Sequence, residues 1–176
     1  MSSRKSDALA LLEEHGETLH ALLTRLTLRV DVAEDLMQEL FCKLVQSDRF
    51  AAAENRLAYA TRMAMNLAFD DRRSRKRNAA VELDREPLAT ESPSPLNDLV
   101  QREELEQVLD AITRLPSRSR EIVVSRFLQE LDYASIGNQL GKSPHQVRAL
   151  CNKAVKRLRR LLGSKGDGSS VARPAR

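Results

Sequence analysis

Two kinds of charged cluster in this sequence could bind a ligand. The stretch from Lys142 to Lys165 contains no Asp or Glu, so its positive field is uncompensated and a polyanion is its natural partner. Carboxylates that could hold a metal ion occur at Glu34, Asp35 and Glu39, and again at Asp70 and Asp71. No His lies near them in the sequence and there is no Gly-rich phosphate loop, which favours solvated helix faces. The sequence therefore predicts no metal, no cofactor and no enzyme.

The cationic stretch predicts one helix that runs to Leu162. Ser143 and Gln146 have the spacing of a capping box, and Pro144 fits the first helical position, where no N–H is needed. Gly163 supplies the stop. One face is apolar and consists of Val147, Leu150, Cys151, Ala154, Val155, Leu158, Leu161 and Leu162. The opposite face consists of His145, Arg148, Asn152, Lys153, Lys156, Arg159 and Arg160. A solvated surface helix is the alternative, but solvated faces usually mix charges of both signs, so we favour a nucleic-acid partner.

The residues before this helix have the spacing of a helix-turn-helix motif. A short helix from about Tyr133 to Leu140, capped by Asp132, would end at Gly141, which permits the left-handed backbone of a tight turn. In this motif the second helix enters the major groove by its first turns. The candidates for contacts to base edges are His145, Arg148, Ala149, Asn152 and Lys153, although His145 could equally be a surface donor. Further along, Lys156, Arg157 and Arg160 should mostly hold phosphates.

The rest of the chain indicates an all-α protein of two small domains. Hydrophobic residues make up 41% of the 176 residues, but aromatic residues only 3% and Trp is absent, which favours aliphatic helix packing. Apolar periodicity predicts helices at about 7–29, 31–46, 56–77, 99–115 and 117–131. The second of these starts with Asp31 and Glu34 at capping-box spacing, and residues 47–55 are predicted to form a loop.

The second and third predicted helices each carry a charged face. On the second helix Glu34, Asp35, Gln38 and Glu39 lie together, and because folding does not need them, they indicate a partner. The third helix ends in Arg72, Arg73, Arg75, Lys76 and Arg77, more positive charge than the helix dipole explains. Its core side is suggested by Leu57, Ala60, Ala64 and Leu67, whereas Met65 and Phe69 fall elsewhere on the helical wheel.

Composition sets the expected domain boundaries. Three prolines and several acidic residues without a hydrophobic period mark a linker at 79–96, between domains at 7–78 and 97–163, and the tail at 164–176 should be disordered. Cys42 and Cys151 lie in helical patterns without metal-ligand spacing, so we expect reduced, buried thiols. There is no signal-peptide pattern and no run of roughly 18 apolar residues, which predicts a cytoplasmic protein without membrane insertion.

Four motifs in combination point to a family. They are Asp31-Val-Ala-Glu-Asp-Leu-Met-Gln-Glu39, Ala64-Met-Asn-Leu-Ala-Phe-Asp70, Leu115-Pro-Ser-Arg-Ser-Arg-Glu121, and Leu131-Asp-Tyr-Ala-Ser-Ile-Gly137 followed by Leu140-Gly-Lys-Ser143. Over about 8–78 and 98–162 the chain resembles bacterial sigma factors of the extracytoplasmic-function (ECF) group, which keep only the second and fourth conserved regions of the sigma-70 family. The resemblance implies a factor that recruits core RNA polymerase to specific promoters and assists promoter melting.

The resemblance also implies a role for each charged face. The second helix would bind the clamp region of the largest polymerase subunit through Glu34, Asp35, Leu36, Gln38 and Glu39. The third helix would hold the −10 element through Tyr59, Arg62, Asn66, Asp70 and Arg73, and the loop at 47–55 would receive a flipped base. The helix-turn-helix would read the −35 element through six residues: His145, Arg148, Ala149, Asn152, Lys153 and Lys156. The polymerase flap and an anti-sigma factor would be further partners.

Two departures from the family pattern and one rival function complete the expectations. Met65 and Leu150 stand where relatives commonly carry basic residues, so each DNA site should make fewer backbone contacts. The rival is a two-domain helix-turn-helix regulator that does not bind core polymerase. It would explain the helix-turn-helix and the linker, but it would not require the acidic second helix or the basic third one. The sequence therefore favours a sigma factor that acts in the cytoplasm, at the nucleoid.

Overall fold

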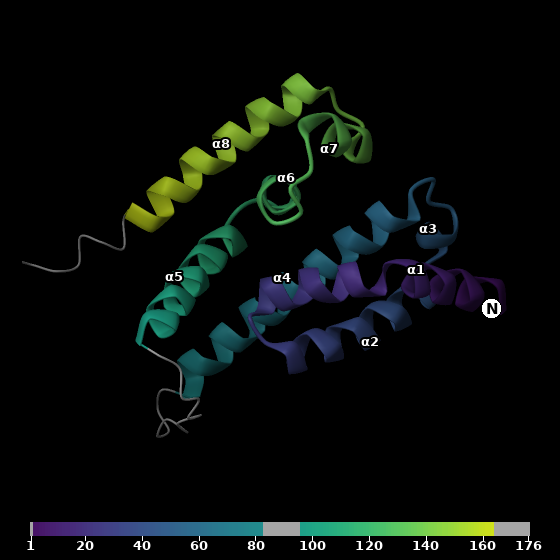
Figure 1. Ribbon diagram of the computed structural model, residues 1–176, viewed down its shortest axis with the longest axis horizontal. Helices are drawn as coiled ribbons and strands as arrows, with labels where there is room; N and C mark the ends of the chain where they lie inside the picture. Colours follow the sequence, from purple (N-terminus) through teal and green to yellow (C-terminus); the bar gives the residue numbers. More distant parts are fainter. Residues whose placement is uncertain (1, 83–95, 164–176) are drawn as a thin grey trace, which may run out of the picture.

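The computed structural model describes residues 2–82 and 96–163, and each regular element within these ranges is a helix (Figure 1). The elements are α1 (Ser2–Thr27), α2 (Val30–Gln46), α3 (Asp48–Ala51), α4 (Arg56–Glu82), α5 (Leu96–Thr113), α6 (Ser117–Phe127), α7 (Tyr133–Leu140) and α8 (Pro144–Gly163). None of these helices is both long and apolar enough to span a membrane. The prediction of an all-α protein is confirmed.

The first half of the chain is a bundle of α1, α2 and α4. α1 and α2 pack against each other and both pack on α4, while the short α3 contacts the start of α4. Aliphatic side chains at helical spacing fill the interior, among them Leu19, Leu23 and Leu26 of α1 and Leu40 and Leu44 of α2. Each such leucine stabilises the fold by about 1.5–3 kcal/mol through removal of apolar surface from water.

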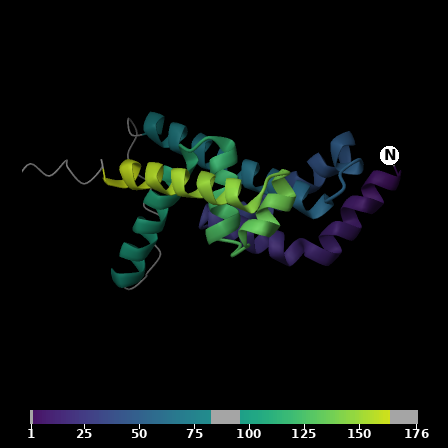
Figure 2. The same ribbon diagram turned by 90° about the horizontal axis from the view of Figure 1, so that it is seen from above.

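The second half of the chain is built around α8. One end of α8 packs with α6 and α7 over a small core of Ile122, Ile136, Val147 and Cys151. The other end packs on α5, which crosses it at a steep angle when the molecule is seen from above (Figure 2). α8 is thus held at both ends, and its remaining face is free to carry charge.

Helix α4 belongs to the first half, but it is buried on two sides because the second half packs against it as well. Its first side packs on α1 and α2, and its second side meets α5 and, through Arg120 and Glu121, α6. Met65 and Phe69, which did not fit the predicted core side, are 4% and 0% exposed. A helix with two buried faces has no clean amphipathic period, which is why the sequence pattern was ambiguous here. The buried cluster of the first half continues without a break into α5, α6 and α8.

Several predicted helix boundaries were wrong, mostly by a few residues. α1 begins at Ser2 rather than Asp7, α4 continues to Glu82, and α6 ends at Phe127 rather than near Leu131. The predicted loop at 47–55 contains a helical turn, α3, whose cap is the Ser47 hydroxyl accepting from the Phe50 N–H at 3.2 Å. Ser, Asp and Asn are frequent in loops and at helix caps alike, so composition alone did not separate the two.

The predicted cap of the second helix was also wrong. α2 starts at Val30, so Asp31 lies inside the first turn rather than before it. Its carboxylate pairs with Arg29 at 2.5 Å, which lowers the pKa of Asp31 mainly through that hydrogen bond. α1 ends at Thr27, two residues before the predicted end, and Leu28 directly after it has a φ of 58°, which is unusual for a leucine. The Thr27 hydroxyl supports the turn by donating to the Leu23 carbonyl and accepting from the Arg29 N–H.

The expectations for the two cysteines and for the linker are each confirmed only in part. Both cysteines are free thiols, but only Cys151 is buried, since Cys42 lies on an exposed position of α2. Of the predicted linker, residues 79–82 continue α4 and residue 96 starts α5, whereas 83–95 lie outside the described residues. The predicted tail at 164–176 also lies outside them.

Candidate functional site

The start of α8 is fixed by the predicted capping box. The Gln146 N–H donates to the Ser143 hydroxyl at 3.2 Å, and the Ser143 N–H donates to the Gln146 side-chain oxygen at 3.1 Å. Pro144 occupies the first helical position, as the sequence predicted. Two N–H groups that would otherwise lack partners are satisfied, so the first turn of α8 keeps a defined direction.

The turn before α8 depends on two glycines. Gly141 ends α7 with a φ of 63° in the left-handed region, and its N–H donates to the Gly137 carbonyl. A Cβ atom on Gly137 would lie 2.4 Å from the Lys142 carbonyl oxygen, so only glycine allows the close approach. Asp132 caps the other end of α7 by accepting from the Ser135 N–H at 2.6 Å, which lowers the pKa of Asp132. These contacts make the helix-turn-helix that the spacing predicted.

The two faces of α8 divide as the sequence predicted. Val147, Cys151, Ala154 and Leu158 are buried. All six residues expected to contact DNA are exposed: His145, Arg148, Ala149, Asn152, Lys153 and Lys156. Leu150, where a basic residue is common in relatives, packs against the core of the helix-turn-helix and therefore has a structural role. Burial raises the pKa of the Cys151 thiol, which keeps it neutral inside this core.

One stripe of α4 carries four of the five residues expected at the −10 element. Arg62, Asn66, Asp70 and Arg73 are exposed along successive turns. The fifth, Tyr59, is only partly exposed, because its hydroxyl bonds to the Ser47 hydroxyl at 2.8 Å and its ring lies 6.1 Å from the Phe50 ring. Tyr59 therefore joins the start of α4 to the segment expected to receive a flipped base.

In this structure the −10 stripe is not free of the second half. Arg62 donates to Glu121 of α6 at 2.7 Å, and a hollow of about 220 Å³ beside this pair is lined by Met65, Asn66, Ser117, Arg118 and Arg120 as well. Arg73 pairs with Asp70 within the stripe itself. Met65 is 4% exposed beneath this contact, so its departure from the family pattern also serves packing.

The acidic face of α2 is exposed apart from one residue. Glu34, Asp35, Gln38 and Glu39 are all exposed, and within the described part of the chain only Glu39 has an ion-pair partner, Lys43 at 3.3 Å. Leu36, also predicted for polymerase binding, is 7% exposed and packs in the core beneath this face. No group of three or more His, Cys, Asp or Glu side chains within the described ranges is arranged to hold a metal ion.

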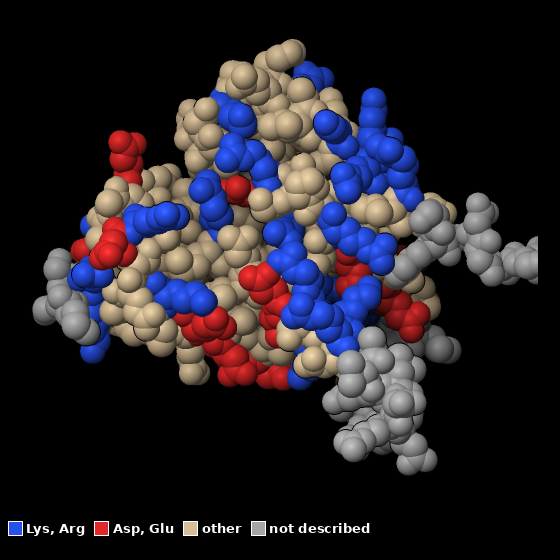
Figure 3. Space-filling view, turned by 180° about the vertical axis from the view of Figure 1, so that it is seen from behind, with Lys and Arg blue, Asp and Glu red and all other residues tan. Residues whose placement is uncertain are grey.

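The charged faces are segregated on the surface. Figure 3 shows Lys and Arg gathered over α8 and over the end of α4 below it. Acidic side chains lie beside these over α5, and others gather toward the lower edge, where α2 lies. A polyanion is attracted to the first surface and repelled from the second. The molecule therefore offers separate surfaces to a nucleic acid and to a basic protein partner.

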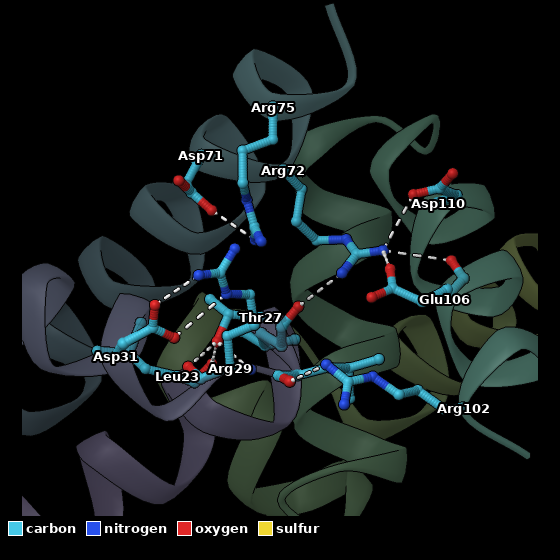
Figure 4. A network of polar contacts seen from close by, with 12 residues as sticks. Leu23, Thr27, Arg29, Asp31, Asp71, Arg72, Arg75, Arg102, Glu106 and Asp110 are labelled. Atoms are coloured by element: carbon cyan, nitrogen blue, oxygen red, sulfur yellow. Dashed lines mark hydrogen bonds and ion pairs between the residues drawn. The ribbon is translucent and has the colours of Figure 1, made fainter. Parts of the chain in front are cut away.

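The sequence did not predict the role of Arg72. It was grouped with the cations at the end of the third helix, but it is 6% exposed and lies between the halves (Figure 4). It donates to the Leu26 carbonyl at 3.3 Å, to the Glu106 carboxylate at 2.6 Å and to Asp110 at 3.0 Å. Arg72 follows Met65 by seven residues and Phe69 by three, which places all three on one face of the helix, and this spacing was the available signal.

Comparisons with known proteins agree with this division into two halves. Residues 11–78 match the family model for sigma-70 region 2, and residues 111–160 match the model for sigma-70 region 4. The chain is 27% identical over 157 residues to RNA polymerase sigma factor CarQ of Myxococcus xanthus, covering 87% of each chain. It is 30% identical over 168 residues to ECF RNA polymerase sigma factor SigM of Mycobacterium tuberculosis, covering 93% of this chain and 81% of that protein.

A solved structure is similar at a lower level. It is the sigma factor RpoE of Bartonella quintana, crystallised in complex with the anti-sigma factor NepR. The match has a TM-score of 0.48 and 21% identity, and it covers 93% of this chain and 98% of that chain.

Proposed function

This chain belongs to the ECF group of the sigma-70 family of RNA polymerase sigma factors. From that premise we propose which of its surfaces binds core polymerase and which bind the promoter elements during transcription initiation. The factor recruits core polymerase to specific promoters and assists melting at the −10 element, while polymerase itself performs all catalysis. The domains are residues 7–78 for polymerase and the −10 element and 97–163 for the −35 element.

The observation that carries this proposal is the exposed, cationic and well-capped α8 in a helix-turn-helix. Its first turns present Arg148 and Asn152, side chains suited to bidentate contacts with guanine and adenine. Lys153 is a further candidate for a base edge, and Lys156 lies further along and holds a phosphate. The exposed stripe of α4 holds the −10 strand, and the segment joined to it through Tyr59 receives the unstacked base. Unstacking costs about a few kcal/mol, which contacts between the base and this segment offset.

The acidic face of α2 is the docking surface for core polymerase. Three carboxylates and one amide, all exposed, suit a basic surface of the clamp region of the largest subunit. The polymerase flap contacts the second half, and an anti-sigma factor competes for these surfaces. The factor acts in the cytoplasm, at the nucleoid. A regulator that does not bind core polymerase has no use for this acidic face.

Reconstitution with core polymerase tests the proposal. Promoter fragments that the reconstituted holoenzyme retains are selected from genomic DNA and used as templates for transcription. The purified chain plus core polymerase should start transcripts at a fixed site on these fragments, and core polymerase alone should not. If a folded protein fails to bind core polymerase at low salt, the function is wrong.

A further inference from the structure

The start of α1 lies beside α3, and the apolar period of the sequence did not predict it as helical (Figure 1 and Figure 2). The predicted helix begins at about Asp7, whereas α1 begins at Ser2. Ala8 and Leu11 are buried in the core of the first half, with 0% and 8% of their surface exposed. Arg4 and Asp7 precede them by four residues each and therefore share their face of α1. This face thus has an ionic end beyond its apolar part.

Two ion pairs join the ionic end of α1 to the two ends of the segment 47–55. Arg4 pairs at 2.6 Å with Asp48, the first residue of α3, and Asp7 pairs at 3.1 Å with Arg56, the first residue of α4. The order of charges is positive then negative on α1, and negative then positive along the segment. Only one alignment of the two brings opposite charges together, so the pairs fix the position of the segment relative to α1.

The segment itself offers little side-chain surface to pack. Residues 51–53 are three successive alanines, and residues 51 and 52 are exposed. Phe50 is its apolar anchor and is 0% exposed. The Arg56 guanidinium lies 5.8 Å from the centre of the Phe50 ring, within the range of a cation–π contact, so the pair with Asp7 bears on the same anchor. The contacts with α1 therefore restrain a segment that its own side chains hold only at Phe50 and at its caps.

The two ion pairs are too exposed to matter for folding, but they are strong enough to shape a loop. The side chains of Arg4 and Asp48 are 35% and 87% exposed, and those of Arg56 and Asp7 are 41% and 30% exposed. Exposed ion pairs contribute little to the stability of a whole protein. Local opening of a loop costs far less free energy than global unfolding, so the same small contribution shifts the population of one loop geometry.

We propose that Arg4 and Asp7 are positioning residues for the −10 element, which hold the segment 47–55 in the shape that accepts the flipped base without contacting that base. The inference rests on the proposed function of this segment. The start of α1 determines how strongly one base is preferred over the other three. The phosphate contacts made by α4 determine the affinity that all sequences share.

The test uses full-length variants, each reconstituted with core polymerase. Arg4→Gln with Asp7→Asn removes both pairs, and Lys5→Gln with Glu13→Gln removes one cation and one carboxylate from exposed positions of the same helix. Arg4→Asp alone places two carboxylates together, and adding Asp48→Arg reverses the first pair. Circular dichroism and urea unfolding establish that each protein is folded.

The measurement is the preference for one base at each position of the −10 element. Single-stranded oligonucleotides of a selected promoter carry each of the four bases at each position in turn, and fluorescence anisotropy gives Kd at one salt concentration. The ratio of the poorest to the best Kd cancels phosphate contacts, which are common to all sequences. At one position the ratio should fall about threefold to tenfold in the Arg4/Asp7 variant, the combined effect of two exposed ion pairs.

The other variants show whether the ion pairs cause this loss. The Lys5/Glu13 control should keep the wild-type ratio at every position. Arg4→Asp should lose the preference at the same position as the Arg4/Asp7 variant, and Asp48→Arg should restore it in the reversed pair. Binding of core polymerase and of a −35 duplex should be unchanged in all of them.

Three outcomes would overturn the inference. The first is an unchanged ratio at every position in a folded Arg4/Asp7 variant. The second is weaker binding of every oligonucleotide by one factor, which would make Arg4 a phosphate contact. The third is a reversed pair that does not restore the preference. A wild-type holoenzyme that starts no transcripts, or that prefers no base anywhere in the −10 element, contradicts the proposed function instead.

Discussion

Gly137 lies where α7 passes closest to the turn before α8. The substitution Gly137→Ala places a methyl group 2.4 Å from the Lys142 carbonyl oxygen, so backbone must move. We expect a loss of about 1–3 kcal/mol in the free energy of unfolding, as for other overpacked sites, measured by urea denaturation. Gly16→Ala in α1 is the control, because no atom lies within 4 Å of its added Cβ. That variant should gain about 0.5–1 kcal/mol from helix propensity.

Arg148 is the exposed side chain of α8 best suited to read a base. If it makes a bidentate contact to guanine, Arg148→Ala should lower discrimination between the cognate −35 duplex and a scrambled duplex by about 1–3 kcal/mol. Lys156→Ala is the comparison, since a phosphate contact should weaken binding to both duplexes equally. Competition binding at one fixed salt concentration measures both. An equal loss on both duplexes for Arg148→Ala would make it a phosphate clamp.

Single residues were predictable from the sequence when neighbours in the chain decide their role. The capping pair Ser143 and Gln146 is local, and both hydrogen bonds are present. Leu150 and Met65 were also interpreted by comparison with relatives, as lost DNA contacts, which stays a prediction, and both side chains pack against apolar neighbours. Helical periodicity had already placed Leu150 on the apolar face of its helix, whereas Met65 fell off the predicted core side of the third helix.

At the scale of elements, the capping box determines how firmly the first turn of α8 is held. Ser143→Ala removes the hydroxyl that accepts from the Gln146 N–H and should lower the free energy of unfolding by about 1 kcal/mol. Ser117→Ala is a matched control, because Ser117 starts α6 without a side-chain cap. Because the reading residues follow this turn, the −35 duplex should also dissociate faster from Ser143→Ala. An unchanged stability would show that the cap is dispensable.

The acidic face of α2 gives a second test at this scale. Glu39→Lys reverses a charge on the exposed face and also ends the pairing with Lys43, a local contact worth only a few tenths of a kcal/mol. We expect weaker docking to core polymerase with unchanged helicity, measured by fluorescence anisotropy and circular dichroism. Glu13→Lys makes the same charge change on an exposed position of α1 and should dock normally. Normal docking by Glu39→Lys would remove this face from the mechanism.

Helix α4 shows that hydrophobic periodicity can predict a helix without predicting which of its faces are buried. Its existence followed from the sequence, but its faces did not, because Met65 and Phe69 are covered by elements that come later in the chain. The same holds for Arg72, whose partners lie 34 and 38 residues away. A charged residue in a basic run is usually solvated, so the spacing of Arg72 from Phe69 was a weak signal, and the packing of α5 against α4 is what buries Arg72.

At the scale of the whole molecule, the contact between the halves should depend on pH through Asp110. Its pKa in the folded protein is lowered, so its contribution to stability is complete above the unfolded value of about 4 and is lost as pH falls through the lower folded value. Asp110→Asn should therefore be less stable than the wild type near neutral pH. The difference should shrink on acidification, when Asp110 is itself neutral. Urea unfolding across this range measures the difference, and a gap that stays constant contradicts the assignment.

The packing of the two halves against each other was the largest structural feature that the sequence did not predict. Two domains and a connecting segment were predicted from composition, and the family models match one region in each half. Contacts such as Arg62 with Glu121 join surfaces that each look like ordinary solvated helix faces when considered alone. Their pairing depends on three-dimensional complementarity, which a one-dimensional pattern does not contain.

The double burial of α4 also limits how this protein can be dissected. A fragment that ends after α4 would leave Met65 and Phe69, now covered by α5 and α6, open to water. Such a fragment should bind hydrophobic dyes, tend to self-associate and rebind a separately produced fragment of α5 to α8 in trans. Affinities measured on isolated halves would then describe surfaces that the intact free chain conceals.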